Sequence, residues 1–246
     1  MFYVIPHRAL RQSVTLNPAV NLFHFSKKYA IMQVMIITYF GKQFFKIEQG
    51  KMVLAVNPVS KESKSGVSAR FGADIALITT NHPDYNGLEQ VSFGERVPFV
   101  VTGPGDYEVK EIFIHGVPSG VEIAGKKYIN TIYNLTIENI TITFLGALGS
   151  GELSTEAREA ISDPDILFIP VGDSSGKSGL MDAKASAKLA SSLEPKLIIP
   201  MDYDAAALKV FLKETGDDSA ETVDRLTLKA KDLDGKEGDV VVLKAV

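Results

Sequence analysis

The stretch ADIALITTNHPDYNG, residues 73–87, joins an apolar run to a short polar loop that contains several potential metal ligands. Residues 73–80 predict a strand buried on both faces, because the run is short, apolar and followed by polar residues. The loop carries His82 and Asp84 in an H-x-D pattern, with Tyr85 directly after them. A strand end can hold such side chains rigidly, as a metal site requires. Taken alone, however, H-x-D is a common pattern, and hydrogen bonds that stabilise the loop are the simpler explanation.

Working outward, the chain reads as many short strands followed by alternating strands and helices. Around Glu138 and Asn139, two alternating apolar segments predict a hairpin. Gly216 predicts the end of a helix. The sequence predicts strands in residues 35–41, 43–50, 51–58, 73–80, 99–109, 111–120, 127–146, 165–171 and 195–203, helices in 153–162, 181–193 and 204–216, and a closing pair of strands around the turn at 234–236.

Residues 1–34 show neither helical nor strand periodicity. We predict that they form an N-terminal extension, either poorly ordered or a start-site artefact ahead of Met35. Residues 35–246 contain no linker rich in proline, glycine or serine, so we expect them to form one domain. Strands in the first half and strand–helix alternation in the second indicate an α/β protein with sheets covered by helices.

Charge and composition exclude several functional classes. The formal net charge is -4, and every acidic residue lies beyond residue 47, so the body of the chain is acidic. An acidic body argues against a nucleic-acid or anionic-membrane surface, which needs clustered lysine and arginine. The absence of cysteine excludes disulfides and thiolate-bound zinc and fits a cytoplasmic location. No apolar run is long enough for a membrane span, and residues 1–34 lack the features of a secretory signal.

The order of several segments resembles the metallo-β-lactamase superfamily, and most closely its branch of metal-dependent hydrolases similar to ascorbate-6-phosphate lactonase. The resemblance runs from about residue 36 to the C-terminus and implies a four-layer αβ/βα sandwich, in which two sheets face each other with helices outside. It is carried by the segments ITYFG, LAVNP, LITTNHPDYNG, GPGDYEV, NTIY, ITFLGALG, DILFIPVG and KLIIPMDY.

The metal ligands of that family are mostly missing from this sequence. In the T-H-x-H-x-D-H loop of active members, only the second histidine and the aspartate match, as His82 and Asp84. The residues at the remaining ligand positions are Thr80, Tyr85, Gly120, Ala147 and Asp202. Because threonine, glycine and alanine cannot replace imidazole or carboxylate ligands around two metal ions, the resemblance implies that the di-metal site is largely lost.

Three functional hypotheses follow from this resemblance and these departures. The first is a non-catalytic or altered-function homologue, a pseudoenzyme without a cofactor, whose pocket of His82, Asp84, Tyr85 and Asp202 binds a small anionic ligand or a protein partner. The second is a hydrolase of a small ester, lactone or phosphoester that keeps a single Mn²⁺, Mg²⁺ or Fe²⁺ on His82, Asp84 and Asp202. Members of the family often self-associate, so a homo-oligomer is a further expectation.

The third hypothesis is a nucleotide-binding protein that uses the loop at residues 172–178, between a predicted strand and helix. The segment GDSSGKS resembles a phosphate-binding loop, but it is one residue shorter than G-x-x-x-x-G-K-[ST]. A shortened loop would disturb the ring of amides around a phosphate, so this alternative is the weaker one. The same loop matches G-x-S-x-G, yet no histidine follows His115, which argues against a serine hydrolase.

Overall fold

The computed structural model describes residues 34–161 and 163–246. The interpretation of residues 1–34 therefore falls, except for Val34, outside the described residues. The first sheet has six strands in the spatial order β13 (Leu226–Leu228), β1 (Met35–Gly41), β2 (Phe44–Gln49), β3 (Met52–Val56), β4 (Ile75–Ile78) and β5 (Phe99–Thr102). The second has eight strands, in the order β12 (Glu221–Val223), β14 (Asp239–Leu243), β11 (Leu197–Tyr203), β10 (Ile166–Gly172), β9 (Ile140–Phe144), β8 (Lys126–Ile137), β7 (Ile112–Ile123) and β6 (Gly105–Val109).

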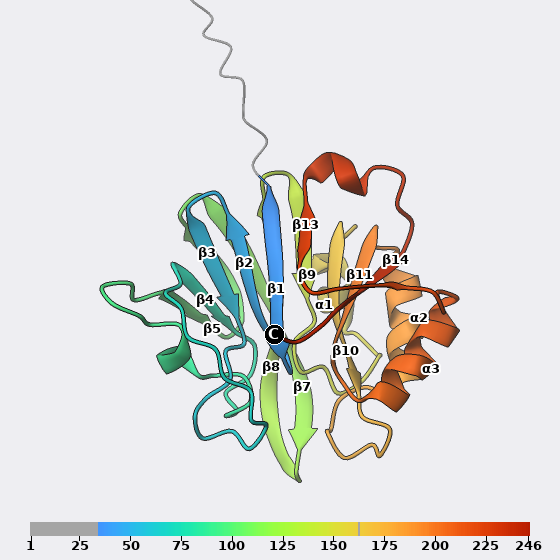
Figure 1. The fold of residues 1–246 in the computed structure, drawn as a ribbon. Coiled ribbons are helices and arrows are strands. Elements are labelled where there is room, and N and C mark those ends of the chain that lie inside the picture. Colours follow the sequence, from blue (N-terminus) through green and yellow to red (C-terminus); the bar gives the residue numbers. More distant parts are fainter. Residues whose placement is uncertain (1–33, 162) are drawn as a thin grey trace, which may run out of the picture. The chain divides into compact units, whose positions relative to one another are not determined.

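The two sheets pack face to face around one apolar core, as the family resemblance implies (Figure 1). Phe45 of the first sheet contacts Phe168 of the second edge-on, with ring centroids 4.8 Å apart. Phe168 stacks in turn on Phe144 at 4.2 Å. All three rings are fully buried, and such contacts add to the stabilisation from apolar burial. The predicted α/β sandwich is confirmed.

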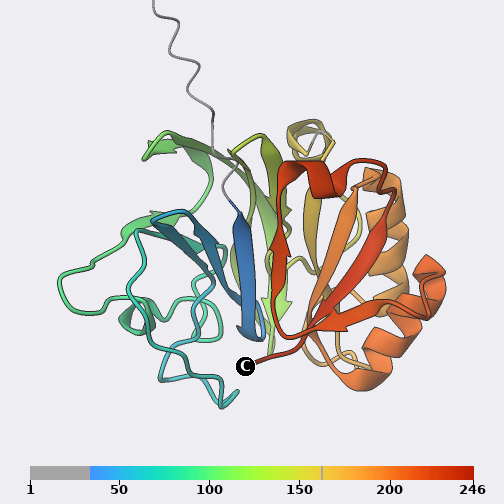
Figure 2. The same cartoon turned by 45° about the horizontal axis from the view of Figure 1, so that its top comes forward.

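Helices cover the outer face of the second sheet. Both α2 (Ala183–Leu193) and α3 (Ala205–Thr215) lie against it, and the short α1 (Thr155–Ala160) adds to the same apolar cluster (Figures 1 and 2). Asp182 caps α2 by accepting hydrogen bonds from two backbone amides of its first turn. Gly216 ends α3 in the left-handed conformation, at φ 76°, as the sequence predicts.

The outer face of the first sheet is covered mainly by irregular chain. Apolar side chains from residues 57–73 and 79–98 pack on this face, and the helical part of that layer is the single turn η1 (Leu88–Gln90). The sandwich therefore keeps four layers, but one outer layer is made of loops within the described residues. On the whole described part of the chain, no helix has the length and apolar character needed to cross a membrane.

Local sequence correctly predicts the pairing of strands at one turn, residues 138–139, but not at the turn between the two closing strands. Glu138 and Asn139 both have positive φ, 50° and 66°, and join β8 to β9 in the predicted hairpin. The two closing strands behave differently. Although only a short segment with the one-turn helix η2 (Ala230–Leu233) separates them, β13 pairs with β1 in the first sheet and β14 pairs with β11 in the second. The closing strands therefore do not form a hairpin.

The sheets bring several loop segments to one end of the sandwich. In the first sheet β3, β4 and β5 run parallel, and in the second β9, β10 and β11 run parallel. The loop after β4 reaches across to the second sheet, where the amide of Thr131 donates a hydrogen bond to the carbonyl of Thr79 at 2.8 Å. Consequently the 79–87 loop lies beside the end of β11 and the turn between β1 and β2.

Candidate functional site

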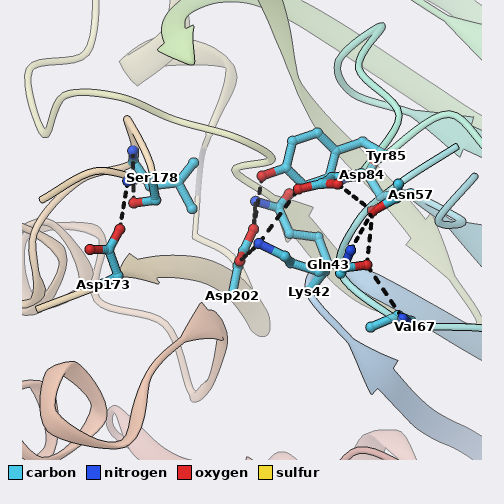
Figure 3. Close-up of polar contacts among 12 residues, drawn as sticks. Lys42, Gln43, Asn57, Val67, Asp84, Tyr85, Asp173, Ser178 and Asp202 are labelled. Atoms are coloured by element: carbon cyan, nitrogen blue, oxygen red, sulfur yellow. Dashed lines mark hydrogen bonds and ion pairs between the residues drawn. The ribbon is translucent and has the colours of Figure 1, made fainter. Parts of the chain in front are cut away.

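A three-residue charged cluster lies at this end of the sandwich. The Nζ atom of Lys42 lies 3.5 Å from Oδ2 of Asp84 and 3.3 Å from Oδ1 of Asp202 (Figure 3). Lys42 comes from the turn between β1 and β2, Asp84 from the loop after β4, and Asp202 from the end of β11. The structure thus brings together two of the predicted site residues with a lysine that the sequence did not indicate.

Buried polar side chains surround the second carboxylate of this cluster. The Tyr85 hydroxyl donates to Oδ2 of Asp202 at 2.8 Å, and Gln43 Nε2 donates to the same oxygen at 3.4 Å. Asn57 Nδ2 donates to Oε1 of Gln43 at 3.0 Å and to the hydroxyl of Thr79 at 2.9 Å (Figure 3). Both oxygens of Asp202 therefore have partners, as a carboxylate that is only 7% exposed requires.

The electrostatics of the cluster follow from burial and from the lysine. Burial raises the pKa of Asp202, while Lys42 and then Tyr85 act in the opposite direction. Burial would lower the pKa of Lys42, but the carboxylates of Asp202 and Asp84 outweigh it and raise that pKa. Burial, followed by the charge of Asp202, raises the pKa of Tyr85 well above its ordinary value. At neutral pH, Tyr85 is thus a hydrogen-bond donor and Lys42 is a cation.

His82 takes part in the loop and not in the charged cluster. Its Nδ1 atom accepts a hydrogen bond from the Asp84 amide at 3.2 Å. The imidazole lies between two aromatic rings, 5.8 Å from Tyr85 and 5.4 Å from Tyr128 between centroids. Asp84 accepts a further hydrogen bond from the Ser63 hydroxyl at 2.5 Å. These contacts correspond to the simpler, loop-stabilising interpretation of the H-x-D pattern.

Asn130 connects the positions where the family resemblance places other ligands. Its Oδ1 accepts from the hydroxyl of Thr80 at 3.0 Å and from the amide of Ala147 at 2.7 Å. Its Nδ2 donates to the carbonyl of Leu145 at 2.9 Å and to the hydroxyl of Ser119 at 2.8 Å. Asn130 is fully buried, so one side-chain amide links its own strand β8 to three other segments, at Thr80, at Ser119 and at residues 145–147. No sequence signal indicates this role, beyond the position of Asn130 in NTIY.

The donor set does not fit a di-metal centre. Among residues 34–161 and 163–246, no group of three or more histidine, aspartate or glutamate side chains is arranged to hold a metal ion. The two carboxylates of the cluster already share the cation of Lys42, and one nitrogen of His82 accepts a backbone hydrogen bond. Thr80 and Ala147 are buried within the hydrogen bonds of Asn130.

The loop at residues 172–178 is folded around one of its own side chains. The carboxylate of Asp173 accepts hydrogen bonds from the amides of Ser175 at 2.9 Å and Lys177 at 3.2 Å. It also accepts one from the amide of Ser178 at 2.5 Å (Figure 3). The hydroxyl of Ser175 donates to it as well. Backbone amides that would surround a phosphate are thus directed at an internal carboxylate. This arrangement disfavours nucleotide binding here.

A separate cavity of about 440 Å³ lies where the parallel strands β4 and β5 end. Its lining is entirely uncharged and includes Asn81, Asn86, Leu88, Pro104 and Ile129. Asn86 Nδ2 donates to Oδ1 of Asn81 at 2.7 Å, which leaves the second half of each amide without a hydrogen bond among the described residues. Crevices at the carboxyl ends of parallel strands commonly bind ligands.

Comparison with known proteins gives the same picture of the fold. Residues 36–202 match a family model described as a beta-lactamase superfamily domain. A search of curated proteins finds no match to this chain.

Solved structures similar to this chain include three hydrolase-like proteins. A protein from Thermotoga maritima, assigned as a Zn-dependent hydrolase of the metallo-β-lactamase superfamily, is 28% identical, with a TM-score of 0.64 over 85% of this chain and 98% of its own. A protein from Parabacteroides distasonis, assigned as a metal-dependent hydrolase, is 20% identical, with a TM-score of 0.56 over 76% and 91%. Igni18, a metallo hydrolase from Ignicoccus hospitalis, is 16% identical, with a TM-score of 0.54 over 80% and 99%. The last two support the fold alone.

Proposed function

Because the chain belongs to the β-lactamase superfamily, whose metal-dependent hydrolases it resembles, we propose that this member has lost the two-metal centre and acts by binding instead of hydrolysis. One observation carries the proposal. The buried amide of Asn130 makes four hydrogen bonds, and two of its partners, Thr80 and Ala147, stand at positions where the family has metal ligands. A site whose ligand positions carry threonine and alanine lacks the imidazole and carboxylate groups that hold two ions around a shared hydroxide.

The test of this proposal is metal content followed by activity. We expect the full-length protein, purified without chelator and then exposed to Zn²⁺, Mn²⁺ or Mg²⁺, to contain no stoichiometric metal by inductively coupled plasma mass spectrometry. We also expect no turnover of lactone and phosphoester substrates above a His82→Ala/Asp84→Ala control. Stoichiometric metal in the wild-type protein that disappears in that control would refute the proposal.

The second candidate function is a hydrolase with one Mn²⁺, Mg²⁺ or Fe²⁺ held by His82, Asp84 and Asp202. The closeness of Asp84 and Asp202 to one common point favours it, because hard cations prefer carboxylate oxygens. Against it, the ammonium of Lys42 already lies at that point. The same metal measurement separates the two candidates, since only the hydrolase requires a bound ion.

We propose that the ligand is a small uncharged molecule, bound in the cavity beside β4 and β5. The sequence led us to expect an anionic ligand or a protein partner. Two carboxylates against one ammonium do not favour an anion at the charged cluster, however, and the cavity has no charged lining. The Nδ2 atom of Asn81 and the Oδ1 atom of Asn86, beside apolar Leu88 and Ile129, suit a neutral ring bearing hydroxyl groups. A cytoplasmic location and a homo-oligomer stay predictions.

Ligand-observed NMR tests the cavity directly. We expect saturation transfer to methyl β-D-glucoside and weaker transfer to its anionic analogue, glucose 6-phosphate. Ile129→Arg should abolish the signal by placing a long charged side chain at the cavity. Phe113→Arg is the matched control, because Phe113 and Ile129 are both 68% exposed and Phe113 does not line this cavity. Equal signals from the two variants would refute the assignment of this cavity.

A further inference from the structure

We propose that the ammonium of Lys42 is a tethered cation, which takes over from a metal ion the task of balancing the carboxylates of Asp84 and Asp202. The inference rests on the proposed function, since it explains how this member remains stable without a metal. It assigns Lys42 a role that neither the family membership nor the sequence pattern supplies.

The first argument is the geometry around the nitrogen. One oxygen of Asp84 and one of Asp202 lie 3.5 and 3.3 Å from the same Nζ atom, although Asp84 lies in a loop after a strand of the first sheet and Asp202 lies in a strand of the second. The other oxygen of each carboxylate accepts a hydrogen bond from a neutral donor, the hydroxyl of Ser63 for Asp84 and that of Tyr85 for Asp202. Both carboxylates thus direct one oxygen at a common cation, as carboxylate ligands do around an ion.

The second argument is the backbone that presents these groups. Lys42, Asn57 and Asp202 all adopt left-handed conformations, with φ of 55°, 45° and 51°. For residues with a Cβ this conformation costs about 1–2 kcal/mol each, and it persists where the surrounding structure demands it. Gly41, directly before the lysine, has φ 109°, and its added Cβ would lie 2.9 Å from Val67. The turn is therefore built to direct Lys42 inward.

The third argument is burial and charge. Asp202 is 7% exposed and Asp84 is 21% exposed by side chain, so neither carboxylate is fully hydrated. Like charges at such a site repel each other and need a counter-ion. A one-to-one ion pair, such as partly buried Lys46 with Glu48 at 3.2 Å, joins one carboxylate to one lysine. Lys42 instead serves two carboxylates, one of them buried.

Removal of the tethered cation should create a need for a free one. We expect Lys42→Ala to lower the melting temperature by about 5–10 °C, because it leaves two carboxylates unbalanced. Addition of Mn²⁺ or methylammonium should raise the melting temperature of this variant and leave that of the wild type unchanged. Lys46→Ala is the matched control, with an expected loss of about 3 °C or less and no response to either cation.

A triple variant keeps the test decisive even if Lys42→Ala folds poorly. In Lys42→Ala/Asp84→Asn/Asp202→Asn the repelling charges are gone, so we expect it to be more stable than Lys42→Ala and insensitive to Mn²⁺. The inference is overturned if the triple variant is no more stable than Lys42→Ala, or if Mn²⁺ and methylammonium stabilise Lys42→Ala no more than Lys46→Ala. Stoichiometric Mn²⁺ in the wild type is a different outcome, which refutes the proposed function itself.

Discussion

Replacement of Asn130 by leucine tests whether one side-chain amide holds the site together. The change keeps a similar volume but removes all four hydrogen bonds of a fully buried side chain. The amide of Ala147 and the carbonyl of Leu145 would then lack partners in residues that water does not reach. A buried group left without its partner costs about 1–3 kcal/mol, whereas the half-buried hydroxyl of Ser119 keeps its bond to the carbonyl of residue 130.

We therefore expect Asn130→Leu to lower the free energy of unfolding by about 3–5 kcal/mol. This is a large part of the roughly 5–15 kcal/mol typical of a whole domain. Urea denaturation followed by circular dichroism measures the loss, and the melting temperature should fall by about 8–15 °C.

A neighbouring asparagine on the same strand provides the control. Asn134 is half-buried and makes two side-chain hydrogen bonds, to the carbonyl of Ala160 at 2.9 Å and from the hydroxyl of Thr143 at 3.2 Å. Its replacement by leucine should cost about 1–2 kcal/mol, because water can satisfy part of what is lost. If the two leucine variants differ by less than about 1 kcal/mol, Asn130 does not hold the segments together as we infer.

Three further predictions concern the backbone, the 172–178 loop and the core. Gly146→Ala should destabilise strongly in thermal unfolding, because its Cβ would lie 2.4 Å from a buried amide oxygen at φ 64°, whereas Gly120→Ala, with no atom within 4 Å, should be neutral. Hydrogen bonds from Ser175 and its neighbours hold the pKa of Asp173 below its ordinary value, so Asp173 stabilises the fold above pH 3.8. The stability advantage over Asp173→Asn should disappear as pH falls below that value toward the folded-state pKa. Phe168→Ala should cost about 3–5 kcal/mol in urea unfolding, without regaining stability in Mn²⁺.

The sequence predicted most strands well because they are strongly apolar and their turns carry local signals, as at Glu138 and Asn139, whereas the four-layer sandwich was implied by the family resemblance. It also indicated that Asp84, Tyr85 and Asp202 share a site, through the family resemblance. It missed Lys42 because a lysine after a strand-ending glycine has the appearance of a solvent-exposed turn residue. Its role depends on Asp202, which lies 160 positions away in the sequence and in the other sheet.

Two further features of the fold could not be predicted from the sequence, for the same reason. The turn at residues 234–236 predicts a reversal of the chain but cannot specify that β13 and β14 belong to different sheets. The outer layer over the first sheet is held by dispersed apolar residues, such as Val59, Phe71 and Val91, that have no helical spacing. Neither feature has a periodic signal, because each depends on contacts between segments far apart in sequence.

Because β13 pairs with β1, the first described strand lacks one of its neighbours for most of the time that the chain is being synthesised. β1 is the strand that emerges first from the ribosome among the described strands, yet its partner β13 follows only after residue 225, with Met35 opposite Leu228. At typical elongation rates of about 5–20 residues per second, roughly 10–40 s pass between the two. During that time one edge of an apolar strand remains open to other chains. The nascent protein is therefore exposed to edge-to-edge aggregation until β13 pairs with β1.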